Sequence, residues 1–314
     1  MIIDYIDAYK LRFGVAPICT VLNEHGYEIA PSTYYAAKAR GASATEVADA
    51  HAANTLLDLY TTNRGLYGVR KLWHAARRQG LEVGRDQVAR LMRITGIVGA
   101  RRGAHRTVTT VRSETAARHP DLIQRAWHAP TRPDEWWVAD FTYVWTYTGF
   151  VYVSFITDVF SRMILGWKVS TSKQTHLVAS ALEQALFTRR RTDTSFTATG
   201  LVHHSDAGSQ YTSIAFTEAL AEAGLAGSIG TVGDALDNAL MESTIGLYKT
   251  ELIDLERRSW ASRSEVETET AAWVHWYNTT RLHSSIGYAP PAEYESRYRS
   301  EHVPQTGSAD LAAA

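Results

Sequence analysis

The feature that most constrains the fold is an acidic residue inside an apolar segment that has the composition of a β-strand. The segment 136–144 is rich in aromatic and β-branched residues, and Asp140 lies at its centre. A carboxylate on a buried strand is costly unless it is paired or coordinates a metal. Asp206 ends a second short apolar segment, and Glu242 lies in a helix-like one. If the three acids converge at strand ends, they predict a Mg²⁺ site for phosphoryl chemistry, because Mg²⁺ prefers oxygen ligands.

The bulk properties describe a chain long enough for two or three domains. It has 314 residues, of which 45% are hydrophobic, and 9 Trp, which is enough for real cores. The longest apolar run, around residues 150–156, is too short to cross a bilayer, and the N-terminus lacks the pattern of a secretion signal. The single Cys19 excludes an internal disulfide and a cysteine metal cluster. We therefore expect a cytoplasmic protein without a membrane partner.

Positive charge is concentrated in one part of the chain. The formal net charge is −1, but residues 62–112 hold 12 basic and 2 acidic side chains, a net charge of +10, and the segments on both sides are net acidic. A basic segment with so few compensating acids is typical of a DNA-binding surface. A solvated arginine-rich face is the alternative.

Helical patterns dominate the first third of the chain. Residues 1–44 are predicted to be an N-terminal helical segment, with two short helices within 14–40 that form either a small helix-turn-helix or an ordinary hairpin. Residues 45–98 are predicted to be a helix-turn-helix DNA-binding domain, and a purely structural three-helix bundle is the alternative. Its predicted helices are 45–61, 67–78 and 85–93. Residues 99–134 are predicted to be a basic, proline-containing linker.

From Glu135 onward, the pattern of apolar residues changes to one typical of β-strands. The predicted order of elements is βββαβαβα. The predicted strands are 136–145, 150–157, 163–169, 200–204 and 225–229, with helices at 174–190, 213–223 and around Glu242. This α/β core should span residues 135–258. A C-terminal helical extension, 259–300, and a flexible tail, 301–314, should follow.

Four ordered motifs carry a resemblance to a known family. Asp140 in W-V-A-D-F-T-Y, Asp206 in H-S-D-A-G-S-Q-Y and Glu242 in D-N-A-L-M-E-S look like the DDE triad of retroviral-integrase-like transposases, with 35 residues between the last two acids. The C-terminal W-Y-N-T-T-R-L-H and G-Y-A-P-P resemble the signature of the bacterial insertion-sequence-three family. The match covers about residues 45–298. It departs from the pattern at Ala207, where many relatives carry a larger polar residue.

The resemblance implies a ribonuclease H-like catalytic core and a DNA transposase. Such an enzyme would bind the terminal inverted repeats of an insertion sequence and would cleave and join DNA strands. Asp140, Asp206 and Glu242 would be both the catalytic and the metal-binding residues. Two Mg²⁺ ions would be the cofactors, with Mn²⁺ able to substitute. Asp140 would bridge the two ions.

The resemblance and the charge pattern also imply partners. Double-stranded DNA, both the terminal repeats and the target, would be bound by an oligomer of this chain, which would associate with the bacterial nucleoid. In this family an upstream reading frame commonly supplies a further helix-turn-helix and a leucine zipper. The chain has no run of apolar heptads long enough for such a zipper, so an upstream-frame protein is a further expected partner. The side chains expected at the DNA are Arg70, Lys71, Arg85, Arg90, Arg93, Arg101, Arg102, Arg106, Asn238, Lys249 and Arg281.

Other interpretations of single residues and of the whole chain stay open at this stage. Asp158 could be a fourth ligand but is better explained by a turn or a salt bridge. His203 and His204 are better explained as core residues than as contacts to DNA. A tyrosine recombinase, a repressor that has lost catalysis and a ribonuclease are the rival functions. The arginine-rich helix-turn-helix favours duplex DNA over the ribonuclease.

Overall fold

The computed structural model describes residues 2–101, 120–123, 130–194, 196–206, 208–230, 239–255 and 259–302. The chain forms two compact units, Met1–Leu57 and Asp58–Ala314, and the division falls inside helix α4 (Ala44–Thr62). Within the described residues no helix is both long enough and apolar enough to cross a membrane.

The first unit is helical, as predicted, but it has one helix more than the sequence-based prediction. Its helices are α1 (Ile2–Phe13), α2 (Val15–Glu24), α3 (Pro31–Ala39) and the first part of α4. Pro31 occupies the first turn of α3, where its missing N–H costs nothing. A small core joins the helices, and it contains Ile6, Ile18, Cys19, Ile29 and Tyr34.

The second unit begins with the end of α4, α5 (Val69–Arg78) and α6 (Arg85–Thr95). Helix α6 has one buried face and one exposed face. Val88, Leu91 and Met92 are buried, and the guanidinium-bearing face is exposed, as expected of an amphipathic helix. Gly96 ends α6 in the left-handed conformation, at a φ of 72°, which a residue with a side chain rarely adopts.

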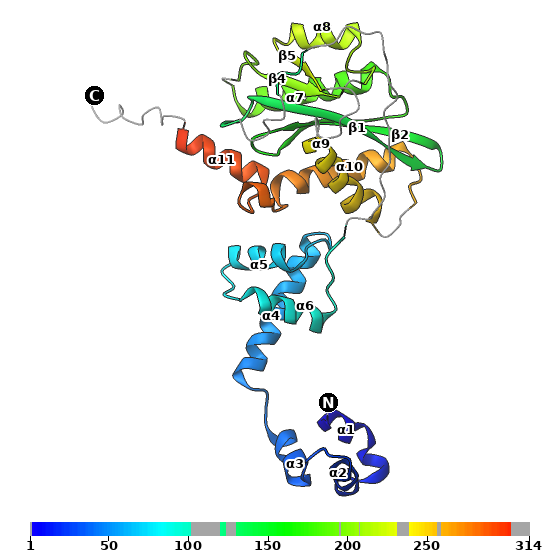
Figure 1. Cartoon of the computed structure of the whole chain (residues 1–314), viewed down its shortest axis with the longest axis vertical. Coiled ribbons are helices and arrows are strands. Elements are labelled where there is room, and N and C mark those ends of the chain that lie inside the picture. Colours follow the sequence, from blue (N-terminus) through cyan, green and yellow to red (C-terminus); the bar gives the residue numbers. More distant parts are fainter. Residues whose placement is uncertain are drawn as a thin grey trace, which may run out of the picture. The chain divides into compact units, whose positions relative to one another are not determined.

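A five-stranded mixed sheet forms the centre of the second unit (Figure 1). Its strands are β1 (Trp136–Thr146), β2 (Gly149–Asp158), β3 (Ile164–Ser170), β4 (Val202–Ser205) and β5 (Ala226–Ile229). The spatial order is β3-β2-β1-β4-β5, with an antiparallel meander from β1 to β3 and parallel pairing of β1 with β4 and of β4 with β5. With the helices α7 (Thr175–Thr192), α8 (Ile214–Glu222) and α9 (Ala239–Tyr248), the predicted order βββαβαβα is confirmed.

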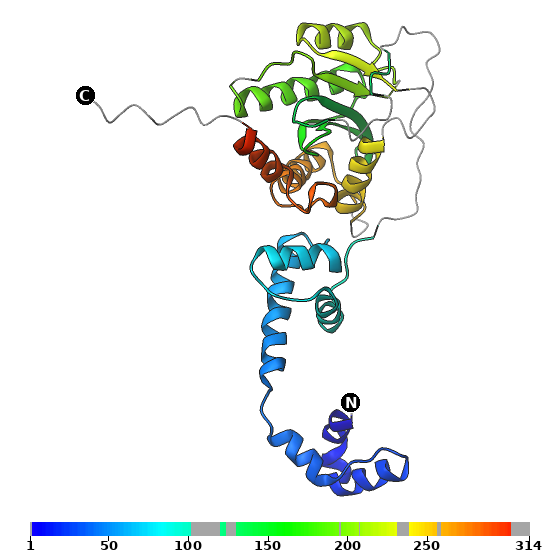
Figure 2. The ribbon, with the colours of Figure 1, turned by 60° about the vertical axis from the view of Figure 1, so that its left-hand side comes forward.

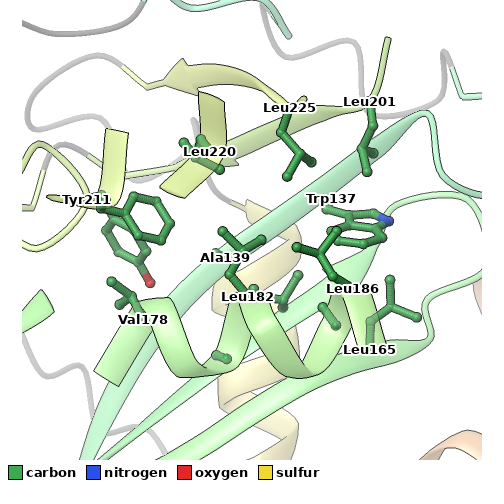
Figure 3. Packing of buried hydrophobic residues seen from close by; sticks show 14 residues of the cluster. Trp137, Ala139, Leu165, Val178, Leu182, Leu186, Leu201, Tyr211, Leu220 and Leu225 are labelled. Carbon is green, nitrogen blue, oxygen red and sulfur yellow. The ribbon is translucent and has the colours of Figure 1, made fainter. Parts of the chain in front are cut away.

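Helices cover both faces of the sheet (Figure 2). On one face, Trp137 and Ala139 of β1 pack with apolar side chains of α7 and α8 (Figure 3). Gly166 of β3 permits this packing, because a Cβ there would lie 2.0 Å from the carbonyl oxygen of Ala181 in α7. On the other face, Phe155 of β2 contacts the rings of Tyr248 and Trp273, which belong to α9 and to α10 (Arg263–Thr279).

A buried ionic cluster ties the C-terminal helix α11 (Pro291–His302) to the core. Arg189 of α7, only 1% exposed, donates to Glu295 of α11 at 2.5 and 2.6 Å and to Asp134 at 2.7 Å. Asp158, at the end of β2, lies 3.7 Å from the same guanidinium. Because a lone buried guanidinium would be costly, these carboxylates fix the position of α11 against α7.

Candidate active site

Two of the predicted acids lie side by side on neighbouring strands. In the parallel pairing of β1 with β4, Ala139 is opposite Ser205. Asp140 follows Ala139 and Asp206 follows Ser205, so both carboxylates lie at the same level of adjacent strands, which are separated by about 4.8 Å. The carboxyl end of β4 thus lies beside the middle of β1. Beyond this point β1 continues and pairs only with β2.

The electrostatics of this pair disfavour two full negative charges. Burial raises the pKa of Asp140 well above its ordinary value, and the neighbouring charges of Asp206 and, more weakly, Glu242 raise it further. The backbone N–H of Phe141 donates to Asp140 Oδ1 at 2.7 Å and lowers this pKa, but less than burial raises it. A cation placed at this pair would stabilise both charges, and oxygen donors are what a hard divalent cation prefers.

Glu242 comes from a different element. It lies in the first turn of α9, a helix that packs against β1, and its side chain is exposed. Among the described residues, no three His, Cys, Asp or Glu side chains lie close enough together to hold a metal ion. The structure therefore brings Asp140 and Asp206 together and leaves Glu242 nearby but outside a ready three-ligand set.

A hydrogen bond from the backbone of Gly208 holds the side chain of Asp206 just after β4. Gly208 N donates to Asp206 Oδ1 at 3.0 Å, and a Cβ on Gly208 would lie 2.9 Å from that same oxygen. The aspartate is thus bound to a turn that tolerates only glycine without adjustment, which restricts the rotamer of its carboxylate. Ser213, and not Asp206, caps the following helix α8.

One residue beside the acids was not predicted from the sequence. Tyr211 is 1% exposed, and burial together with the charges of Asp140 and Asp206 raises the pKa of its phenol well above the ordinary value. Its ring packs against Phe141 and Phe216. The available signal was its place five residues after Asp206 in the same motif.

Two of the side chains expected at the DNA, Asn238 and Lys249, lie close to Glu242 in the sequence. Lys249 begins a π-helical turn, Lys249–Ile253, directly after α9. Its ammonium donates to the carbonyl oxygen of Tyr143 on β1 and lies 5.1 Å from the centre of the Tyr143 ring. A contact of Lys249 with DNA would require this bond to be exchanged. Asn238 lies outside the described residues.

The interpretations of Asp158, His203 and His204 as structural residues are confirmed. Asp158 is fully buried and accepts hydrogen bonds from the backbone N–H groups of Asp134 and Ser161, at 2.8 Å each. Both histidines are 1% exposed, and His204 Nδ1 lies 2.8 Å from Ser228 Oγ. These residues support the strands that carry the acids.

The cations predicted at DNA fall into exposed and buried sets. Arg70, Arg85, Arg90, Arg93 and Arg101 are exposed, Lys71 is half-buried, and Arg102 and Arg106 lie outside the described residues. Arg281 differs from the exposed set. It is 4% exposed, and its Nη2 and Nε pair with Glu251 at 2.6 and 2.8 Å, so its guanidinium is already bound within the protein.

Comparison with known proteins places these features in recognised families. Residues 130–235 match a model described as an integrase core domain, and residues 223–291 match a second model of the same description. Residues 46–105 match an HTH-like domain. The matched ranges contain all three acids and the helices α5 and α6.

Several similar proteins are transposases of insertion sequences. The chain is 45% identical to the transposase for insertion sequence element IS629 of Shigella sonnei over 98% of this chain and 99% of the relative. It is 46% identical to a protein assigned to insertion sequence element IS986/IS6110 of Mycobacterium tuberculosis, over 86% of this chain and 96% of the relative. It is 31% identical to the transposase for insertion sequence element IS904 of Lactococcus lactis, over 76% and 90%.

Solved structures show a weaker likeness. The catalytic core domain of HTLV-2 integrase in complex with magnesium is 16% identical, with a TM-score of 0.39, over 52% of this chain and 98% of that one. A simian T-cell lymphotropic virus intasome chain is 12% identical, with a TM-score of 0.43, over 82% and 78%. These scores are too low to carry an argument, so the family assignment rests on the sequence relatives.

Proposed function

This chain belongs to the insertion-sequence transposases with an integrase core, of the insertion-sequence-three family and the DDE superfamily, and we propose that it cleaves and joins DNA strands at a Mg²⁺ site made by Asp140, Asp206 and Glu242. The observation that carries the proposal is the register of β1 and β4, which makes Asp140 and Asp206 neighbours. Burial raises the pKa of Asp140, and the nearby charge of Asp206 raises it further, as expected of two neighbouring carboxylates.

The donor set fits Mg²⁺ in its chemistry. Asp140, Asp206 and Glu242 offer only carboxylate oxygens, which are the ligands that Mg²⁺ prefers. Two bound Mg²⁺ ions would supply charge stabilisation for the attacking and leaving oxygens of an in-line phosphoryl transfer, and Mn²⁺ would substitute. Asp140 would be one of the residues that hold the ions, because the charges of both Asp206 and Glu242 act on it.

Each residue has a proposed task in the reaction. Asp140 and Asp206 hold a fixed position on the rigid sheet, and Glu242 approaches from α9. Water is the nucleophile in the cleavage step, and its attack on phosphorus breaks the bond to the 3′-oxygen. The freed 3′-hydroxyl would then attack a phosphodiester of the target strand and displace the 3′-oxygen of that strand, which joins the two DNAs and leaves a free 3′-hydroxyl on the target. No covalent bond between enzyme and DNA is needed.

DNA binding is proposed to begin at the helix-turn-helix. The exposed arginines of α6, Arg85, Arg90 and Arg93, face away from its buried side and are available to the phosphates and base edges of a major groove. We propose that the domains expected from the sequence share the work, with residues 45–98 selecting the terminal repeat and residues 135–258 carrying out the chemistry. Two copies of the chain would pair two ends, with an upstream-frame protein as a further partner.

A strand-cleavage assay tests the proposal. The full chain is incubated with a duplex that carries the candidate terminal repeat, labelled at one 5′ end, in Mg²⁺, in Mn²⁺ and in EDTA. We expect a nick at the end of the repeat and joined products with either metal, and neither with EDTA. Cleavage that persists in EDTA, or binding of the repeat without any cleavage in Mg²⁺ or Mn²⁺, would point to another chemistry or to a repressor.

A further inference from the structure

A cavity in the second unit lies apart from the Asp140–Asp206 pair. We name it the α5–α9 cavity, with a volume of about 600 Å³. The segment 68–71, at the start of α5, forms one side, and residues of α9 such as Ser243 and Thr244 form another. Residues 281–285 after α10 complete the wall. The cavity thus touches both the helix-turn-helix and the helix that carries Glu242.

The lining of this cavity has an excess of positive charge. Four cationic side chains line it, namely Arg70, Lys71, Arg162 and Arg281, and among the described lining residues Glu251 is the one carboxylate. Glu251 is already occupied, because its two oxygens accept from Arg281 Nε and Nη2 at 2.6 to 3.0 Å. Among the described lining residues, no second carboxylate is therefore left to pair with Arg70, Lys71 or Arg162.

Lys71 and Arg162 are the two half-buried cations of this set. Lys71 lies 5.1 Å from the centre of the Tyr67 ring and forms no ion pair within the described part of the chain. Burial, and then the charge of Arg281, lowers the pKa of Lys71 to about 8. Arg162 Nε is buried and has no hydrogen-bond partner in the structure, although a guanidinium N–H is a strong donor.

His283 shows that the cations surround one region. Burial, and then the charges of Arg281, Lys71 and Arg162, lower its pKa well below the ordinary value. The imidazole is therefore neutral and adds no charge. Its Nδ1 lies 3.2 Å from Arg281 Nη1 and its Nε2 lies 3.3 Å from the Tyr277 carbonyl oxygen. Three cations thus act on one buried ring, and no acid other than Glu251 lines the cavity to offset them.

We propose that the α5–α9 cavity is a phosphate-binding site, in which Lys71 and Arg162 contact a backbone phosphate of the bound DNA. This inference deepens the proposed function and rests on it for the source of the phosphate. Partly buried cations without an ionic partner carry a desolvation cost, and an anion that enters the cavity would offset that cost. The ligand carries phosphate because a guanidinium fork and an ammonium together suit its several acceptor oxygens.

The α5–α9 cavity lies between the helix-turn-helix and the helix that carries Glu242. The occupant would touch α5 on one side and, on the other, Ser243 of α9, which follows Glu242 directly. A DNA phosphate in the cavity would therefore link recognition by the helix-turn-helix to the placement of the third acid. It would also position the DNA strand without reading its sequence.

Thermal unfolding of the full chain in inorganic phosphate tests the site without any catalysis. Wild type is compared with Lys71→Gln, Arg162→Gln and, as a matched control, the exposed Lys173→Gln. Each is measured in sodium phosphate and in sodium chloride of equal ionic strength. At a phosphate concentration about tenfold above Kd, we expect a rise in Tm of roughly 3 °C for wild type and for the control, beyond the general effect of phosphate. Both cavity variants should lose this rise.

The same four proteins are then titrated with duplex DNA at several salt concentrations. If the phosphate belongs to DNA, Lys71→Gln should reduce the slope of log affinity against log salt by about 1, and Lys173→Gln should not change it. An equal phosphate-induced Tm rise in all four proteins would overturn the site. If the cavity variants lose the Tm rise but keep the wild-type salt slope, the assignment of the bound phosphate to DNA is overturned. Neither outcome depends on strand cleavage, so both are separable from a failure of the proposed function.

Discussion

At the residue scale, the fold holds the Asp140 carboxylate where little water can stabilise its charge and a bound cation could do so. Its pKa is raised by burial and by Asp206 and Glu242. A carboxyl group whose folded pKa lies above its unfolded pKa loses stabilisation as the pH rises through the folded value. Ionisation of Asp140 is therefore unfavourable in the metal-free protein, and a divalent cation would offset this cost.

We predict that Asp140→Asn stabilises the metal-free protein at pH 7.5 and makes it insensitive to Mg²⁺. Asparagine removes the charge, and its Oδ1 can still accept from Phe141 N, as the aspartate does at 2.7 Å. In wild type, Mg²⁺ about tenfold above Kd should add about 1.4 kcal/mol to the free energy of unfolding. Denaturant titrations with Mg²⁺ and with EDTA measure both effects.

The exposed Glu218→Gln on α8 is the matched control for this experiment and should behave as wild type. If Asp140→Asn keeps the full increase in stability with Mg²⁺, then Asp140 is not a metal ligand.

The sequence predicted which acids matter but not how each one is presented. Asp140 lies inside one apolar strand and Asp206 directly follows another, so the two could be expected together, and the resemblance implied the same pair. The exposure of Glu242 depends on the rotation of α9 about its axis, which distant packing decides. The burial of Arg281 was not predicted, because its partner Glu251 lies 30 residues away and no local pattern reveals the pair.

At the element scale, one guanidinium joins helices and strands that are far apart in the sequence. Arg189 of α7 contacts Glu295 of α11 and lies 3.7 Å from Asp158 of β2. Burial, and then the charge of Glu295, raises the pKa of Asp158 to about 7, although Arg189 lowers it. The stability of the cluster therefore depends on Arg189 most strongly at a pH at which all of its carboxyl groups are ionised.

We predict that Arg189→Met lowers the free energy of unfolding by about 3–5 kcal/mol at pH 8, because it leaves buried carboxylates unpaired. The loss should be smaller at pH 5. Asp158 has a folded pKa of about 7, above its ordinary 3.8, so it takes up a proton as the pH falls below 7 and the repulsion is relieved. Denaturant unfolding at both pH values provides the measurement, and Arg191→Met, exposed on the same helix, provides the control. An equal loss at pH 5 and pH 8 would contradict this account of the cluster.

Most elements of the core were predictable because their apolar periods are clear. The strands and α7 lie within a few residues of the ranges predicted from alternation and from the helical stripe. The prediction lacked α1, although Ile2 and Ile6 have helical spacing. The cluster at Arg189 was not predictable, because Glu295 lies 106 residues away and only the packed fold brings the two together.

At the scale of the whole molecule, the chain combines a net acidic composition with a basic segment for DNA. The net charge of +10 in residues 62–112 lies in a chain whose overall charge is −1. Attraction to DNA should therefore come from this segment, and the acidic remainder should weaken contacts elsewhere. The affinity should depend strongly on salt, since each neutralised phosphate releases counterions.

We predict that the affinity of the full chain for duplex DNA falls about 10³-fold between 50 and 200 mM salt, as expected for about six phosphate contacts. Fluorescence anisotropy with a labelled duplex measures it. Replacing the exposed Arg90 by Gln should weaken binding, and Glu218→Gln should not. An affinity that is flat across this salt range would remove the basic segment from the DNA-binding surface.

The most direct test of the central claim is the single-turnover rate of strand joining by wild type, Asp140→Asn, Asp206→Asn and Glu242→Gln, with Glu218→Gln as the matched control. Affinity for the terminal repeat is measured in parallel for every protein. If the three acids hold the metal at the reacting phosphate, each triad variant should join strands at least about 10³-fold more slowly, with unchanged affinity for DNA, because the lost charge stabilisation is worth several kcal/mol of barrier. The control should keep the wild-type rate. A near-normal joining rate in any one triad variant would contradict the account and would remove that residue from the site.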